Sequence, residues 1–256
     1  MRLLIAGLAF RHLLLGGARR LPEKPRRILV IAPLLAGDAL LLSPLIAKLR
    51  HQHPSSELYL VAGRAVLSLY GRRPYGVIAG AFDPRDPATL LALKQWPVAD
   101  LAVAAGESRY GWLALALGAR WIVGLGGETR RLQNWALDQC VGLPDAPVAW
   151  GDIAATLAPG AAAPPYRSGD WPDPDFLPFE FPSSPYCVLH VQGSSTLKQW
   201  EDEKWAALAQ WLASKGLTVV WSAGRDGQSL IDHIDPSRRF AALGCRLDLA
   251  QLWHLV

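Results

Sequence analysis

The stretch that decides the fold of this chain is His190–Leu212, HVQGSSTLKQWEDEKWAALAQWL. It is preceded by the apolar run Tyr186–Leu189, which predicts a short, buried parallel strand. Small and hydroxyl-bearing residues follow the run, and they predict a loop. Beyond the loop, apolar residues at spacings of three and four predict a helix with the inner stripe Trp205, Leu208, Ala209 and Leu212. The stretch therefore predicts a strand, a polar loop and a helix, in that order.

The loop has the composition of a phosphate-binding site. It contains Gly193, Ser194 and Ser195, and the cation Lys198 comes shortly after them. Backbone N–H groups and hydroxyls can point at one spot, a helix start favours anions, and lysine supplies a full charge. It is not a Walker A loop, because the spacing G-x-x-x-x-G-K-[ST] is absent. The alternative is an ordinary loop with a solvated lysine.

Two stretches resemble the ADP-heptose:lipopolysaccharide heptosyltransferase family, which is glycosyltransferase family 9. Residues 190–200, HVQGSSTLKQW, resemble the loop that follows the first strand of the second domain in that family. Residues 27–44, RILVIAPLLAGDALLLSP, resemble its opening strand, Gly-Asp pair and Ser/Thr-Pro. The resemblance implies an α/β, GT-B-like fold of two doubly wound Rossmann-like domains.

Strand-like and helix-like segments alternate along the chain, which independently indicates doubly wound parallel sheets. Further strands are predicted at Ile28–Ala32, Leu58–Ala62, Val77–Ala79, Leu101–Ala105, Trp121–Leu125 and Leu217–Ser222. Helices are predicted at Asp38–Arg50, Pro87–Trp96, Ser108–Leu117, Leu132–Val141, Trp150–Ala158 and Leu247–Val256. Residues 159–185 hold eight of the twenty prolines, so neither a helix nor a central strand is expected there.

These patterns predict four parts. They are a basic amphipathic helix in residues 1–26, an acceptor-side domain in 27–158, a linker in 159–185 and a nucleotide-sugar domain in 186–256. The D-[ST]-G-x-x-H-x-A stretch typical of the family is absent up to Val256. The resemblance therefore implies that the second domain is incomplete.

The resemblance also implies catalytic roles. Asp38 would be the base that deprotonates the acceptor hydroxyl, and Lys198 would stabilise the negative charge on the departing ADP. By its position alone, Asp38 is better explained as the N-cap of the helix that it begins. Asp226 follows the predicted strand Leu217–Ser222, a place suited to a carboxylate that binds ribose hydroxyls. The nucleotide-sugar site would thus comprise Gly193, Ser194, Ser195, Lys198 and Asp226.

Three arginines are candidate ligands of an anionic acceptor: Arg64, Arg130 and Arg131. Taken singly, each is better explained as a solvated surface residue. Neither a metal ion nor another cofactor is expected, because a lysine can fill the cationic role. The Asp173-Pro174-Asp175 stretch resembles a metal-binding D-x-D, but its proline-rich setting indicates a turn.

The positive charge is concentrated at the N-terminus. Residues 1–27 carry a net charge of +6 against +4 for the whole chain, so the remainder sums to −2. This distribution argues against a nucleic-acid-binding body and favours an anionic membrane surface met by residues 1–27. Residues 3–18 place one apolar stripe on a helix, namely Leu3, Ala6, Gly7, Phe10, Leu13, Leu14 and Gly17. That helix either lies in the membrane interface or packs on the protein's own surface.

The expected function is inverting transfer of heptose from ADP-heptose to the lipopolysaccharide inner core, on the cytoplasmic side of the inner membrane. One alternative is a non-catalytic, membrane-associated protein that keeps the acceptor lobe. Another is a GT-B transferase with a different nucleotide-sugar donor.

Overall fold

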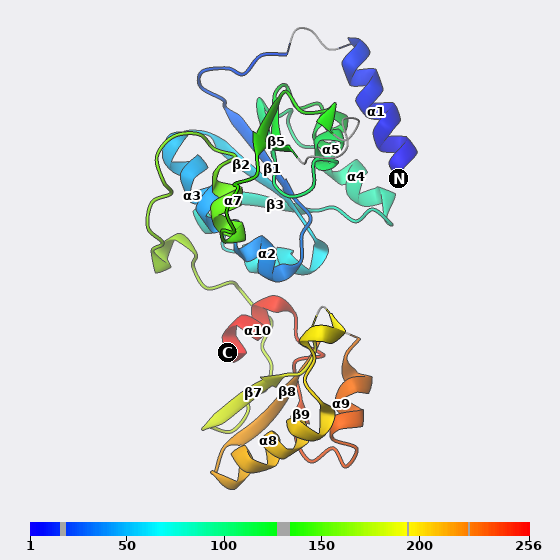
Figure 1. Cartoon of the computed structure of the whole chain (residues 1–256), viewed down its shortest axis with the longest axis vertical. Helices are drawn as coiled ribbons and strands as arrows, with labels where there is room; N and C mark the ends of the chain where they lie inside the picture. Colours follow the sequence, from blue (N-terminus) through cyan, green and yellow to red (C-terminus); the bar gives the residue numbers. More distant parts are fainter. Residues whose placement is uncertain (16–18, 127–133, 194, 225) are drawn as a thin grey trace. The chain divides into compact units, whose positions relative to one another are not determined.

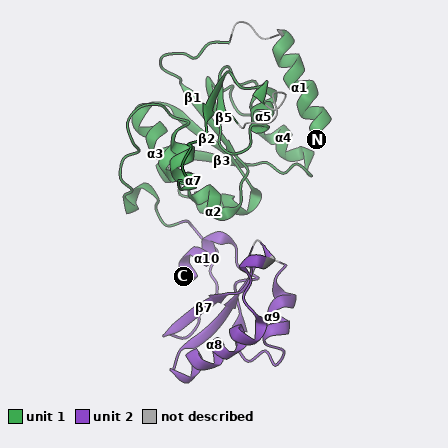
Figure 2. Cartoon of the chain, in the orientation of Figure 1, with its two compact units in different colours: residues 1–173 green, residues 174–256 purple. Residues whose placement is uncertain are grey.

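The structure is a computed structural model that describes residues 1–15, 19–126, 134–193, 195–224 and 226–256. It divides into two compact units, residues 1–173 and 174–256 (Figure 2). Each unit has its own parallel sheet and is described by itself. The boundary between them falls within the proline-rich segment.

The described part of unit 1 is built on a six-stranded parallel sheet in the order β3-β2-β1-β4-β5-β6 (Figure 1). The strands are β1 Arg27–Ala32, β2 Glu57–Ala62, β3 Val77–Ala81, β4 Leu101–Ala104, β5 Ile122–Gly126 and β6 Gln139–Gly142. The reversal of order between β1 and β4 is the doubly wound topology. The apolar run of β4 is buried throughout, and those of β1 and β2 are buried except at their first residues, as strands covered on both faces require.

Helices cover both faces of this sheet (Figure 1). They are α1 Arg2–Leu15, α2 Ala36–Leu40, α3 Ser43–Gln52, α4 Pro87–Leu93, α5 Tyr110–Ala116 and α7 Trp150–Ala155, with short 3-10 turns η1 Arg64–Tyr70, η2 Pro74–Gly76 and η3 Ser168–Asp170. Leu29 and Ile31 of β1 point into a core that α1, α4 and α5 also line. Because side chains alternate along a strand, Ile28 and Val30 face the other side, where α3 packs against α7.

Two predicted helices differ from the structure. The single helix expected at Asp38–Arg50 is two helices, α2 and α3. Pro44 lacks the N–H that would continue the first helix, and it lies instead in the first turn of the second, which begins at Ser43. The helix expected at Leu132–Val141 is wrong for residues 139–141, which belong to the edge strand β6, paired with β5. Leu132 itself lies outside the described residues.

Unit 2 has a parallel sheet in the order β7-β8-β9 among its described residues. The strands are β7 Tyr186–His190, β8 Thr218–Ser222 and β9 Ala241–Ala242; the helices are η4 Thr196–Lys198, α8 Asp202–Ser214, α9 Gln228–Ile234 and α10 Leu249–Leu255. Trp221 of β8 is fully buried at the centre of the core of this unit. The Tyr186 hydroxyl donates to the Leu255 carbonyl at 2.8 Å and so fixes α10 against β7.

Candidate functional site

In unit 2, the carboxyl ends of β7 and β8 are joined by side-chain hydrogen bonds. His190 Nδ1 lies 3.0 Å from Ser222 Oγ, and the Gln192 Oε1 atom accepts the Gly224 N–H at 2.7 Å. The parallel register makes these contacts possible, because His190 is directly opposite Ser222. The loops after both strands therefore meet at the edge where α/β proteins bind ligands.

Glycines let the backbone come close at this edge. A Cβ added at Gly244 would lie 2.2 Å from the Ser222 hydroxyl oxygen, and one added at Gly227 would lie 2.7 Å from Gln192 Oε1. Both distances are far below a van der Waals contact, so only glycine fits without a shift. The close packing holds the loop after β7 in a defined position.

The loop after β7 folds back on itself and carries Lys198. The Lys198 N–H donates to the Ser195 carbonyl at 3.0 Å, and the Leu197 N–H lies 3.3 Å from the Ser195 hydroxyl. A Cβ at Gly193 would lie 3.1 Å from the Lys198 Cβ. The structure thus brings together Gly193, Ser195 and Lys198. Ser194 lies outside the described residues.

The ammonium group of Lys198 is available to an anion. The side chain is exposed, and no described residue forms an ion pair with it. The neighbouring cation Lys204, by contrast, is paired with Glu201 at 2.7 Å. The structure thus places a lysine that pairs with no described residue beside a glycine and a serine at the carboxyl edge of a strand; its binding of a phosphate stays a prediction.

The helix start contributes less to this site than the sequence suggests. A 3-10 turn follows the loop, and α8 begins only at Asp202. Its first turn carries the carboxylates of Asp202 and Glu203, which already complement the positive end of the helix dipole. The attraction for an anion therefore rests mainly on Lys198.

Asp226 lies in the turn after β8 and is exposed. The turn is closed by the Gly227 N–H, which donates to the Gly224 carbonyl at 2.8 Å. Gln192 belongs to the loop that carries Lys198, and its side chain accepts the N–H of Gly224 in the turn that carries Asp226. This one glutamine therefore connects the two segments. Sequence reasoning did not find Gln192 or Ser222, because only the pairing of β7 with β8 shows that they meet.

In unit 1, Asp38 lies in the first turn of α2, which follows β1 after a short loop. It is exposed, and no described group is hydrogen bonded to its carboxylate. The N-cap interpretation is wrong, because the helix begins at Ala36 and its N-cap residue is Leu35. The Trp150 indole N–H lies 3.3 Å from the Asp38 carbonyl and anchors the backbone there. The position thus leaves the carboxylate free for chemistry.

The candidate acceptor arginines are placed differently. Arg64 Nη2 is 2.8 Å from Asp86 Oδ2, a carboxylate that also caps α4 through the Ala88 N–H. An anionic acceptor would have to compete with Asp86 for this guanidinium. Arg130 and Arg131 lie outside the described residues.

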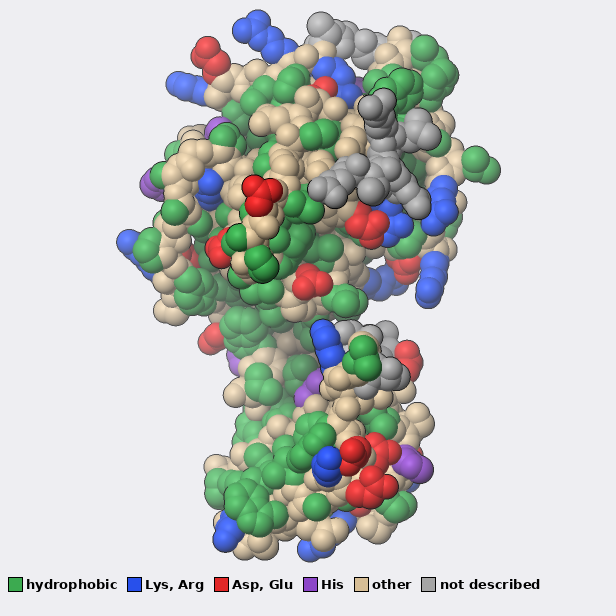
Figure 3. Space-filling view, in the orientation of Figure 1, with side chains coloured by type: hydrophobic (Ala, Val, Ile, Leu, Met, Phe, Trp, Pro, Cys, Tyr) green, Lys and Arg blue, Asp and Glu red, His purple; other side chains and the backbone are tan. Residues whose placement is uncertain are grey.

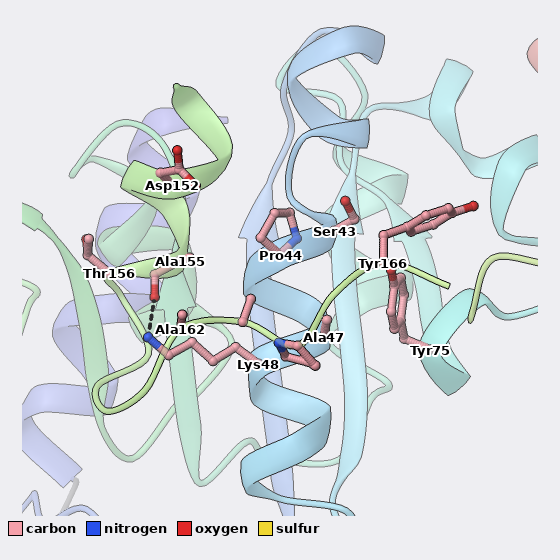
Figure 4. A pocket seen from close by; sticks show the side chains of 12 residues that line it. Ser43, Pro44, Ala47, Lys48, Tyr75, Asp152, Ala155, Thr156, Ala162 and Tyr166 are labelled. Carbon is pink, nitrogen blue, oxygen red and sulfur yellow. Dashed lines mark hydrogen bonds between the residues drawn. The ribbon is translucent and has the colours of Figure 1, made fainter. Parts of the chain in front are cut away.

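Unit 1 also has a pocket of about 440 Å³ that the sequence did not indicate (Figure 4). Lys48 crosses one end and donates from Nζ to the Ala155 carbonyl at 3.1 Å, while Tyr75 and Tyr166 line the other. Burial, followed by the charge of Asp170, raises the pKa of Tyr75, so its phenol is a neutral hydrogen-bond donor at pH 7. These residues come from segments far apart in the chain, and only folding gathers them.

No three His, Cys, Asp or Glu side chains are arranged as metal ligands among the described residues. The cysteines are not in disulfides: Cys187 and Cys245 are half-buried, and Cys140 is exposed.

Comparisons with known proteins agree with this architecture. The family model of glycosyltransferase family 9 (heptosyltransferase) matches residues 100–256, more than half of the chain. None of the curated protein sequences matches the chain. E. coli heptosyltransferase WaaC, solved with ADP, is similar in structure with a TM-score of 0.66 at 16% identity, over 88% of this chain and 76% of that one.

Two further structures are similar. E. coli ADP-heptose lps heptosyltransferase II gives a TM-score of 0.67 at 19% identity, covering 88% of this chain and 75% of that chain. The family 9 glycosyltransferase of Veillonella parvula gives a TM-score of 0.64 at 15% identity, covering 92% of this chain and 73% of that chain. At these sequence identities the structural similarity shows the fold alone. The assignment to a family rests on the match to the family model.

Taken together, the two parallel α/β units, the loop with Lys198 and the family match define a glycosyltransferase of the GT-B class. The chain belongs to glycosyltransferase family 9, the heptosyltransferase family.

Proposed function

We propose that this glycosyltransferase moves heptose from ADP-heptose to the inner core of lipopolysaccharide. The observation that carries the proposal is Lys198, which forms no ion pair with any described residue and is held beside Gly193 and Ser195 at the carboxyl edge of β7. It lies within the region that the family model matches. A diphosphate is the part of a nucleotide sugar that such a loop is suited to bind. The similar E. coli enzyme WaaC was solved with ADP and with ADP-2-deoxy-2-fluoro heptose, which supports this choice of donor.

The chemistry is an inverting displacement. Asp38, exposed and without a hydrogen-bonded partner among the described residues, takes the proton of the acceptor hydroxyl. The hydroxyl oxygen attacks the anomeric carbon from the face opposite ADP, and the bond from that carbon to the diphosphate breaks. Lys198 stabilises the negative charge that develops on the leaving diphosphate.

The test separates donor binding from transfer. Isothermal titration of the full chain with ADP and ADP-heptose should show binding, and Lys198→Ala should weaken it by roughly tenfold or more, as expected for the loss of a charge-assisted contact. In a heptose-transfer assay, Lys198→Ala should lower kcat by about 10²–10³. Asp38→Asn should lower kcat while leaving ADP affinity unchanged.

The matched control is Lys204→Ala, which removes an exposed lysine of α8 already paired with Glu201. It should leave both binding and transfer unchanged. Unaltered ADP affinity in Lys198→Ala would contradict the role of the loop. Binding of UDP-sugars in preference to ADP-heptose would favour a different donor, and binding of no nucleotide would favour a non-catalytic protein.

A further inference from the structure

Helix α1, Arg2–Leu15, is apolar on both of its faces although it lies on the surface of unit 1 (Figure 1). One face is accounted for by packing. Ala9 is fully buried, and Ile5 and Leu8 contact the core that α1 shares with α5. A helix that needed only this contact would carry polar residues on its opposite face.

The opposite face is apolar and exposed instead. Leu3, Phe10 and Leu14 are spaced by seven and four residues, which places them on one stripe. Their exposed fractions are 89%, 61% and 68%. In Figure 3, hydrophobic side chains gather over the C-terminal end of α1, at the upper right. Packing within unit 1 therefore leaves this stripe without an explanation.

Two arginines border the stripe. At 3.6 residues per turn, Arg2 lies on one flank of the line through Leu3 and Phe10, and Arg11 lies on the other. Both are exposed, and no described residue forms an ion pair with either. The first acidic residue of the chain is Glu23, so residues 1–22 carry positive charge alone.

An apolar stripe bordered by arginines is complementary to the surface of an anionic bilayer. The apolar side chains enter the boundary between headgroups and acyl chains, and the guanidinium groups bind lipid phosphates. A helix of 14 residues is about 21 Å long. No helix among the described residues is long and apolar enough to cross a membrane, so this one would lie in the plane of the interface.

We propose that the stripe Leu3, Phe10 and Leu14, with Arg2 and Arg11, docks unit 1 onto an anionic lipid bilayer. Because the other face of α1 is part of the core, the docked helix holds the whole of unit 1 at the membrane. The proposal does not depend on which sugar the enzyme transfers, and its failure would leave the proposed reaction intact.

Flotation of the full chain with vesicles of phosphatidylcholine, with and without phosphatidylglycerol, tests the proposal. The chain should float with the anionic vesicles. Phe10→Glu should lower its partition onto them by roughly tenfold or more, since one large apolar side chain is no longer buried. The pair Arg2→Gln and Arg11→Gln should lower partition by about tenfold on anionic vesicles and far less on neutral ones.

The matched control is Leu177→Glu, which changes a leucine of unit 2 that is 74% exposed. It should float as the unaltered chain does. All variants should keep the unaltered melting temperature by circular dichroism, because the changed side chains lie outside the core. An unaltered chain that does not float, or a Phe10→Glu variant that floats equally well, overturns the proposal. The proposal is also overturned if the chain binds no vesicle but forms a dimer in sedimentation velocity, and Phe10→Glu abolishes that dimer.

Discussion

At the scale of a residue, Asp235 shows how a buried charge is kept. The side chain is 7% exposed, and its carboxylate accepts hydrogen bonds from the Trp221 indole at 3.1 Å, the Ser237 hydroxyl at 3.2 Å and the Arg239 and Phe240 N–H groups at 3.0 Å each. Burial by itself would raise the pKa of Asp235, but these donors outweigh it, led by the Phe240 N–H, and the pKa is lowered. The ion therefore organises the turn after α9.

Asp235→Asn should destabilise unit 2 by about 2–3 kcal/mol at pH 7, because an amide cannot accept all of these hydrogen bonds. The folded pKa lies below the unfolded value of about 3.9, so the ionised form stabilises the fold above that pH. This contribution is lost as pH falls through the folded pKa. Urea unfolding at a series of pH values should show the difference shrinking below about pH 4.

The control is Asp145→Asn, which changes an exposed carboxylate that forms no hydrogen bond with the described residues. It should leave the free energy of unfolding unchanged at every pH. A constant difference for Asp235→Asn across the series would show that packing, and not ionisation, accounts for the loss.

At the scale of an element, the end of α8 determines where β8 can begin. Gly216 has φ of +85°, and its N–H donates to the Ala213 carbonyl at 3.0 Å. This left-handed residue ends the helix and turns the chain, so that Thr218 starts the strand two residues later. Glycine is suited to this position, because it adopts the left-handed conformation without strain.

Gly216→Ala should destabilise unit 2 by about 1 kcal/mol, because an alanine at positive φ is strained. No atom lies within 4 Å of the added Cβ, so the cost is conformational and not steric. Gly142→Ala is the control, since its Cβ also meets open space at an ordinary φ. Equal effects of the two changes in urea unfolding would contradict this account.

At the scale of the whole molecule, the two units have separate cores. The cluster that includes Leu115 and Ile31 belongs to unit 1, and the cluster around Trp221 belongs to unit 2. The two clusters share no residue. A cavity in one core therefore removes contacts from that unit alone.

Leu115→Ala should destabilise unit 1 by about 3 kcal/mol, because it empties a fully buried site on α5. Amide hydrogen exchange should quicken in β1, β4 and β5, whereas exchange in β8 should keep its rate. Leu177→Ala, at an exposed site, is the control and should change neither. Equal acceleration in both units would show that they unfold together.

Some elements of the fold could be predicted from the sequence more accurately than others. Continuous apolar runs predicted the bounds of β1, β2 and β8 to within one residue. A strand that is buried on both faces consists almost entirely of apolar residues, so its sequence is easy to recognise. The sequence predicts a helix where the edge strand β6 lies, because Gln139 and Cys140 are exposed and only pairing with β5 makes the segment a strand. The predicted role of Lys198 rests on its place in a loop after a strand, which the sequence shows. The contacts of Gln192 have no such local signal, because they depend on the pairing of β7 with β8.

The sequence by itself determined the parallel α/β class, the loop with Lys198 and the concentration of arginines before β1, because local composition and periodicity encode them. The tertiary structure decided which face of α1 enters the core, that Trp150 anchors the backbone at Asp38, and that Gln192 joins two loops. Those facts depend on segments distant in the chain meeting, and no local pattern records that meeting.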